Sequence, residues 1–242
     1  MPTNTQKDYS KLYMPAAIVL AGVIIGAFIM TGLSKGGAVA TGGTQPTVNV
    51  DIKDVITKGE PYIGDANAPV TLAYWSDYQC PFCKAVELGG VHGISIVAAI
   101  PTLVKEYVET GKLRIIFKDF AFLSEDSVTA ALYDHAIWDL YPKKYWEWRE
   151  AMYESQDEEH GGFGDAVSID ALNAKISGID VAKVKAQIVK NTDAYTAAIE
   201  ADKAEGAKFG IQGTPGFITG KTLIPGAVEL ATFKEAIDPQ LK

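Results

Sequence analysis

The feature that most constrains this chain is a cysteine pair, Cys80 and Cys83, placed where a strand is expected to run into a helix. Residues 70–75 (VTLAYW) are rich in β-branched and aromatic side chains, which predicts a strand. Pro81 suits the first turn of a helix, where its missing N–H group is not needed. The sequence therefore predicts the order strand, short turn, first cysteine, helix.

A dithiol at this position favours redox chemistry over structural cross-linking. The chain has 2 cysteines, whereas secreted proteins held together by disulfides carry several dispersed pairs. A bridge across two intervening residues also closes too small a loop to stabilise the fold much. Free N–H groups and the dipole at a helix N-terminus stabilise an anion. We therefore expect Cys80 to have the lower pKa and to attack, and the more buried Cys83 to resolve the mixed disulfide.

The dipeptide Pro81–Phe82 between the cysteines is expected to tune the redox potential. It supplies neither a positive charge nor a polar side-chain donor. The pKa of Cys80 is therefore expected to be lowered, but less than it would be with a histidine in place of Phe82.

Half of a zinc site is the alternative use of two cysteines at this spacing. A tetrahedral site needs about four ligands. The only histidines, His92, His135 and His160, do not have ligand spacing to the pair. His135 shares a helix face with apolar residues, which is typical of a packed or surface histidine. A thiol-based metal-binding module is thus the weaker hypothesis, and we assign no metal and no cofactor.

The first part of the chain contains 23 uncharged residues, at positions 12–34, flanked by Lys11 and Lys35. About 20 apolar residues span a bilayer core, whereas the apolar part of a signal peptide has about 7–15. We therefore expect a transmembrane anchor at 12–34, followed by a flexible Gly/Thr-rich tether at 35–47. A cleaved signal peptide, with 38–40 (AVA) as its cleavage site, and a buried core helix remain alternatives.

Orientation rests on the lysines that flank this segment. Lys7, Lys11 and the amino terminus precede it, and Lys35 follows it. The positive-inside rule then predicts a cytoplasmic tail at 1–11 and an extracytoplasmic domain at 48–242, where disulfides persist. The chain is expected to be a single-pass membrane protein.

The overall charge argues against nucleic acid as a partner. Lys and Arg total 22 against 30 acidic residues, for a net charge of −8. Because phosphate contacts need positive charge, an acidic chain without a basic cluster is a poor candidate for nucleic-acid binding.

Beyond the tether, the pattern predicts an α/β domain with a helical block near its middle. Further strands are expected at 47–50, 113–117, 216–219 and 222–224. Helices are expected at 96–110, through much of 124–209 including a last helix at 192–208, and at 230–237. Ser168 and Asp180 are expected to be helix N-caps. The domain therefore consists of a βαβ half and a ββα half, with helices inserted between them.

Separate motifs resemble the DsbA-like thiol–disulfide oxidoreductases of the thioredoxin superfamily. In chain order they are 64–70 (GDANAPV), 76–84 (SDYQCPFCK), 117–120 (FKDF) and 213–217 (GTPGF). The resemblance covers roughly residues 50–240. It implies a thioredoxin fold with an inserted helical domain at about 124–209. It also implies that Pro215 is cis and faces the cysteines, with the backbone of Thr214 offering an edge to a substrate peptide.

The resemblance implies an oxidase that donates its Cys80–Cys83 disulfide to exported proteins with cysteine thiols. A membrane redox partner would then reoxidise the pair. The same chemistry allows a reductase or isomerase, since direction depends on potential and partner. No separate dimerisation module is recognisable, so we expect a monomer.

Three positions depart from the family pattern. The residue six positions before Cys80 often carries a buried acid in this superfamily, and here it is Tyr74. Proton transfer to and from Cys83 then relies on water or another group. Residues 89–93 (GGVHG) resemble an insertion in the first helix, and 160–164 (HGGFG) have no role that the sequence reveals.

Overall fold

A central strand, β2 (Val70–Ser76), is buried on both of its faces in the computed structural model, which describes residues 49–157 and 161–242. Alternate side chains of a strand point to opposite faces of the sheet. Leu72 and Tyr74 accordingly pack into the larger hydrophobic core, whereas Ala73 and Trp75 pack into a second core. A strand buried on both sides requires a layer on each face of the sheet.

The sheet has five strands in the order β1-β3-β2-β4-β5. Strands β2 and β3 are parallel, as expected for a βαβ unit, and the other neighbouring pairs are antiparallel. The bounds of the remaining strands are β1 Tyr62–Ile63, β3 Leu113–Asp119, β4 Gly216–Thr219 and β5 Thr222–Pro225.

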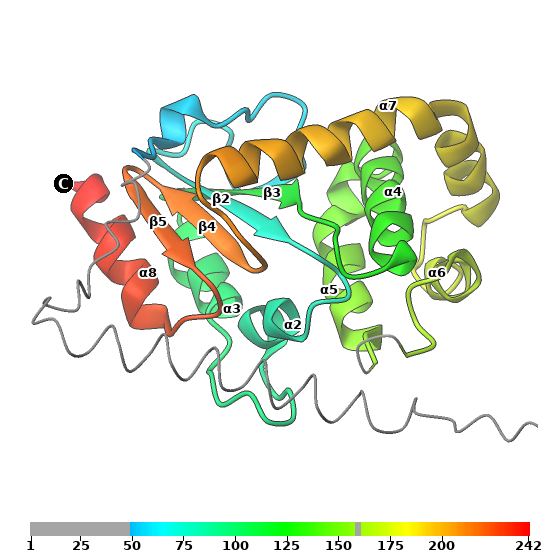
Figure 1. Ribbon diagram of the computed structural model, residues 1–242, viewed down its shortest axis with the longest axis horizontal. Helices are drawn as coiled ribbons and strands as arrows, with labels where there is room; N and C mark the ends of the chain where they lie inside the picture. Colours follow the sequence, from blue (N-terminus) through cyan, green and yellow to red (C-terminus); the bar gives the residue numbers. More distant parts are fainter. Residues whose placement is uncertain (1–48, 158–160) are drawn as a thin grey trace, which may run out of the picture. The chain divides into compact units, whose positions relative to one another are not determined.

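Helices cover both faces of the sheet and form a block at one end. Their bounds are η1 Ile52–Asp54, α2 Pro81–Leu88, α3 Ile100–Leu103, η2 Val104–Val108, α4 Glu125–Leu140, η3 Pro142–Lys144, α5 Tyr145–Ser155, α6 Ala166–Asn173, α7 Val181–Lys208, α8 Leu230–Ile237 and η4 Asp238–Leu241. Figure 1 shows α2, α3 and α8 on one face, with α7 running along the other.

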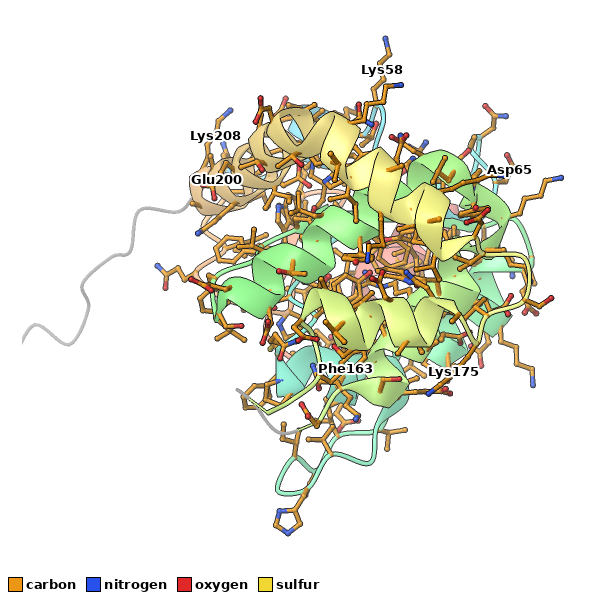
Figure 2. All side chains as sticks on the ribbon, turned by 90° about the vertical axis from the view of Figure 1, so that its right-hand side faces the viewer. Lys58, Asp65, Phe163, Lys175, Glu200 and Lys208 are labelled. Atoms are coloured by element: carbon orange, nitrogen blue, oxygen red, sulfur yellow. The ribbon has the colours of Figure 1, made fainter. Side chains whose placement is uncertain are left out.

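The helical block contains α4, α5, α6 and the first half of α7, between β3 and β4 in the sequence (Figure 1). Figure 2 looks onto this block and shows side chains filling the space between its helices. Tyr145, Trp148 and Met152 of α5 are buried and belong to the same core as Leu72 and Tyr74 of the sheet. The block therefore shares one hydrophobic core with the sheet instead of forming a core of its own.

Most predicted elements are confirmed, but the first strand was wrong. Asn49 and Val50 belong to no strand, and residues 47 and 48 lie outside the described part. The first strand is β1, which pairs with the outer edge of β3. Two residues are too few to show strand periodicity, and Val50 instead packs as an apolar side chain in the second core.

Three helix boundaries also differ from the prediction. The helix expected at 96–110 begins at Ile100, with Pro101 in its first turn, and continues as the π-helical η2. The helix expected at 192–208 is the second half of the single long helix α7, which Asp180 caps as predicted. Ser168 is not an N-cap: its N–H group donates to the carboxylate of Asp165, 2.8 Å away, and Asp165 caps α6.

The predicted tail 1–11, anchor 12–34 and tether 35–47 lie outside the described residues. Within residues 49–157 and 161–242, no helix is both long and apolar enough to cross a membrane.

A buried lysine joins β3 to α7 and to the segment before β1. Lys118 Nζ forms ion pairs with Glu60 at 2.9 Å, with Glu205 at 3.2 Å and with Asp202, and donates to the carbonyl of Ile56 at 3.1 Å. Burial alone lowers the pKa of Lys118, but the carboxylates of Asp202 and Glu60 raise it above its usual value. The ammonium group is therefore charged and neutralises acidic side chains from α7 and from the segment before β1.

We predict that Lys118→Met lowers the free energy of unfolding by about 3–5 kcal/mol, because it leaves buried carboxylates without their cation. The loss is larger at pH 8 than at pH 5, since uncompensated buried carboxylates have raised pKa values and cost more once they ionise. Urea unfolding at both pH values measures this. The matched control Lys234→Met removes an exposed pair with Glu106 and costs at most about 1 kcal/mol. Equal losses in the two variants would contradict this account.

Candidate active site

Cys80 occupies the N-cap position of α2, so it lies at the start of the helix. Its backbone is extended (φ −80°, ψ 118°), and its carbonyl accepts from the N–H groups of Cys83 and Lys84, each at 3.1 Å. Cys80 is 4% exposed and Cys83 is fully buried. The expected placement of the two sulfurs, one at the edge and one behind it, is therefore present.

The loop before β4 brings distant residues to Cys80. The Thr214–Pro215 peptide bond is cis, the form that the resemblance implies. The Cys80 thiol donates to the carbonyl oxygen of Thr214 at 3.3 Å. The hydroxyl of Thr214 is buried, has no hydrogen-bond partner, and lies near both sulfurs. The structure thus places Cys80, Cys83 and the Thr214–Pro215 loop in one site.

The pKa of Cys80 is lowered from 9.0 to about 7. The largest cause of the lowered pKa is a hydrogen bond from the Cys83 thiol. Burial of Cys80 acts in the opposite direction and raises its pKa. The Thr214 side chain and the N–H groups of Cys83 and Phe82 lower the pKa further. The direction agrees with the sequence prediction. The leading cause differs, because the neighbouring thiol contributes more than the helix start.

Cys83 has the opposite environment. Burial, followed by the hydrogen bond and the charge of Cys80, raises the pKa of Cys83 well above 9.0, although the Asp77 N–H group and Thr214 oppose the change. The two thiols are therefore different acids, one that ionises near neutral pH and one that stays protonated.

Comparison with known proteins identifies the family. The family model described as thioredoxin matches residues 56–239. This chain belongs to the thioredoxin family.

Similar proteins narrow the activity within the thioredoxin family. Disulfide bond formation protein D of Bacillus subtilis (strain 168) is 25% identical over 185 residues, covering 76% of this chain and 78% of the relative. The crystal structure of oxidised BdbD from Bacillus subtilis matches with a TM-score of 0.67 and 25% identity over 81% of this chain and 98% of that one. Alpha-DsbA2 from Wolbachia pipientis matches with a TM-score of 0.63 and 28% identity, covering 74% and 86%.

The DsbA-like resemblance is therefore confirmed, and so is the thioredoxin-like α/β fold with a helical insertion. This thioredoxin-family chain is a thiol–disulfide oxidoreductase.

The helical insertion holds the active-site loop through Gln156, a residue that the sequence analysis missed. Gln156 Nε2 donates to the carbonyl oxygens of Tyr78 at 2.7 Å and Cys80 at 3.1 Å. Lys84 Nζ, on α2, donates to the carbonyl of Gln156 at 2.5 Å. A polar residue just after a helix gives no local signal that it reaches a segment 76 residues away.

The carboxylate of Asp77 holds two loops together. Its carboxylate accepts from the N–H groups of Gln79 at 2.8 Å, Phe122 at 3.0 Å and Leu123 at 3.3 Å. Burial raises the pKa of Asp77, and these hydrogen bonds oppose the change. Asp77 therefore fixes the turn before Cys80 against the segment after β3.

Part of the segment 160–164, which had no assigned role, contacts the active-site loop. Gln79 Nε2 donates to the carbonyl of Phe163 at 3.0 Å. Gly164 has a φ of +129°, and a Cβ there would lie 2.0 Å from that same amide nitrogen. Glycine is thus required both by the backbone conformation and by the close approach of Gln79. His160 lies outside the described residues.

A buried arginine lies behind the cysteines in a cage of aromatic rings. The Arg149 guanidinium carbon is 4.1 Å from the ring centre of Phe117 and 5.1–5.3 Å from those of three tyrosines, Tyr74, Tyr78 and Tyr153. Cation–π contacts of this kind stabilise a desolvated cation. Arg149 belongs to α5, so the insertion supplies a positive charge beneath the active-site helix.

Of the histidines that the structure describes, His92 and His135, neither is a partner of the sulfurs. His92 lines a hollow that also includes Pro81. His135 lies 2.9 Å from Asp119 and stacks on Tyr195, which fits the expected packed histidine. Burial lowers the pKa of His135, but Asp119 outweighs it and raises the pKa to about 9. Among residues 49–157 and 161–242, no cluster of three acidic, histidine or cysteine side chains could hold a metal ion.

We predict a single thiolate titration near pH 7 in the reduced protein, absent in Cys80→Ser. Thiolate ultraviolet absorbance measures it. Because the folded pKa of Cys80 lies below 9.0, the thiolate stabilises the folded reduced protein. That stability rises between pH 7 and pH 9 and is lost as the pH falls through 7.

Thr214→Val tests the contribution of the Thr214 hydroxyl to the pKa of Cys80, because valine has nearly the same shape as threonine. We expect the midpoint of the Cys80 titration to rise in this variant, because the Thr214 side chain is one of the groups that lower the pKa of Cys80. A wild-type midpoint near 9, or no change in Thr214→Val, would contradict the account of the Cys80 pKa.

Proposed function

We propose that this protein donates a Cys80–Cys83 disulfide to exported proteins that carry cysteine thiols. The supporting observation is the asymmetry of the pair, with a stabilised thiolate at Cys80 and a buried thiol at Cys83. Because the stabilised Cys80 thiolate favours the reduced dithiol, the Cys80–Cys83 disulfide becomes a stronger oxidant. The direction of transfer also draws support from relatives that are named disulfide bond formation protein D.

The proposed reaction has two displacement steps. A substrate thiolate attacks Cys80 Sγ; the Cys80–Cys83 bond breaks, Cys83 leaves as the thiolate, and a mixed disulfide forms. The second thiolate of the substrate then attacks the substrate sulfur that is bonded to Cys80. The substrate disulfide forms, and Cys80 is released as a thiolate. The substrate loses two electrons and gains a disulfide, and the enzyme becomes the dithiol.

The surface around Cys80 supports the binding of a peptide. Phe82 is 49% exposed beside Pro81, which gives the site an apolar rim. A hollow of about 480 Å³ next to α2 is lined by Pro81, Lys84, Gly90, Val91, His92, Gln156 and Asp157. Thr214 also presents its backbone carbonyl beside the Cys80 sulfur. We propose that this edge positions the substrate cysteine.

We further propose that residues 12–34 anchor the protein in a membrane, with the catalytic domain outside the cytoplasm, as a monomer. There it meets exported chains, and a membrane redox partner reoxidises Cys80 and Cys83. The uncharged segment 12–34 and the lysines that flank it support this arrangement.

One observation favours a reductase instead. The pKa of Cys80, about 7, matches the value of about 7 known for thioredoxin, a reductant, and not the value of about 3.5 for DsbA. A disulfide reductase of the same fold is therefore the second candidate, and the reduction potential separates it from a donor.

We predict that Cys80→Ser abolishes disulfide transfer from the oxidised protein to a reduced, unfolded model protein. Cys83→Ser, the matched variant, cannot carry the internal disulfide, but with an oxidised substrate it accumulates a mixed disulfide at Cys80, because no second thiol releases it. Mass spectrometry after acid quenching measures both, and circular dichroism checks the fold. Transfer by Cys80→Ser would refute the proposed role of Cys80.

A further inference from the structure

Cys83 needs a base that the site described so far does not supply. When the pair is reoxidised, Cys83 must attack the mixed disulfide at Cys80, and only the thiolate is nucleophilic. Yet the Cys83 side chain is fully buried, and burial raises its pKa well above 9.0. The position where the family often has a buried acid is occupied by Tyr74.

Glu87 is an acid on the same face of α2, one turn after Cys83. Residues four apart lie on the same face of a helix. Glu87 is 2% exposed, and its Oε1 accepts from Arg149 Nε at 2.9 Å and Arg149 Nη2 at 2.8 Å. Its second oxygen, Oε2, is buried and has no hydrogen-bond partner. A free acceptor therefore lies in the core beneath the cysteines.

The hydroxyl of Tyr74 is a second polar group in this core, and both Tyr74 and Glu87 contact Arg149. This hydroxyl too is buried and without a partner. Burial, and then the charge of Cys83, with smaller contributions from Tyr153 and Glu87, raises the pKa of Tyr74. Tyr74 is near enough to Glu87 to lower the pKa of its carboxyl, although the two do not form a hydrogen bond of full geometry. Two buried polar atoms without partners thus belong to side chains that contact Arg149, one in the core of Cys83 and the other on the helix of Cys83.

We propose that Tyr74 and Glu87 form a proton route for Cys83, with the Glu87 carboxylate as the terminal base; this rests on the function proposed above. In the mixed disulfide between Cys80 and a partner, the Cys83 proton moves to the Tyr74 oxygen as the Tyr74 proton moves to Glu87 Oε2. Cys83 Sγ then attacks Cys80 Sγ, the bond to the partner breaks, and the partner leaves as a thiolate.

The same route returns the proton when the disulfide is donated. Cys83 leaves as a thiolate, the Tyr74 hydroxyl protonates it, and Glu87 supplies the proton that Tyr74 has lost. The Cys83 thiol then cannot attack the mixed disulfide and reverse the step. Only the sulfurs change oxidation state. The route carries one proton away from Cys83 on reoxidation and one proton back to Cys83 on disulfide donation.

Charged groups on each packed element set the balance of this route. Arg149 of α5 favours the ionised form of Glu87, Glu150 of the same helix adds a like charge, and Tyr153 of α5 is influenced by the charge of Cys83. Burial outweighs Arg149, so the pKa of Glu87 is raised above 4.5, which makes its carboxylate a stronger base than that of an exposed glutamate. Tyr153 is a poorer relay, because its hydroxyl already donates to the carbonyl of Asp77 at 3.4 Å.

The test follows two successive steps in one experiment. The full-length reduced protein is mixed with excess 5,5′-dithiobis(2-nitrobenzoate), which releases one coloured thiolate when Cys80 attacks and a second when Cys83 resolves the mixed disulfide. At pH 7, Tyr74→Phe leaves the first phase unchanged and slows the second about 100-fold, the lower end of the usual effect of general base catalysis. Glu87→Gln slows the second phase likewise. In both variants the second phase regains speed as the pH rises.

Tyr145→Phe is the matched control. Tyr145 is also fully buried, and its hydroxyl donates a 2.8 Å hydrogen bond to Asp134 that the variant loses. Cys83 is not among the groups that shift the pKa of Tyr145. Both phases stay unchanged in it. A normal second phase in folded Tyr74→Phe or Glu87→Gln overturns the proton route while leaving the proposed function intact. Absence of the first phase in the wild-type protein overturns the proposed function itself. If Glu87→Gln does not fold, Tyr74→Phe alone decides.

Discussion

The Cys83 thiol donates a hydrogen bond to the Cys80 sulfur, and this contact is the largest cause of the lowered pKa at Cys80. It depends on a helix that begins immediately after Cys80, because Cys83 then lies one turn away from Cys80. It also depends on a dry interior, since burial keeps Cys83 protonated and able to donate. Ionisation of one sulfur thus requires a proton on the other.

The surrounding fold keeps α2 in the position that this contact needs. Strand β2 is held between β3 and β4, and α2 follows it after a short turn. The insertion then holds the turn from the other side, with Gln156 bonded to the Cys80 carbonyl and Arg149 bonded to Glu87. Breaking a buried ion pair such as Arg149–Glu87 is costly, so α2 and α5 are expected to move together. The insertion is therefore part of the active site's support.

Local signals were sufficient for much of the fold. The strand at 216–219 was predicted with its observed bounds, because glycines and a proline flank it. The helix at 230–237 was predicted with its observed bounds, because its apolar residues recur with a helical period. The cysteine pair and the loop at Thr214 were also predicted. Long-range burial could not be predicted: Arg149 on a helix and Gln156 just after it look like ordinary surface residues until their partners on distant segments are known. Glu87 did offer a signal, its four-residue spacing from Cys83.

The direction of electron flow is the central claim, and the reduction potential of Cys80–Cys83 tests it most directly. The full-length protein is equilibrated in glutathione buffers, and the dithiol and disulfide forms are separated after alkylation. A disulfide donor predicts a potential toward roughly −120 mV, the value of DsbA. A potential toward roughly −270 mV, the value of thioredoxin, would contradict the donor role and make this protein a reductase.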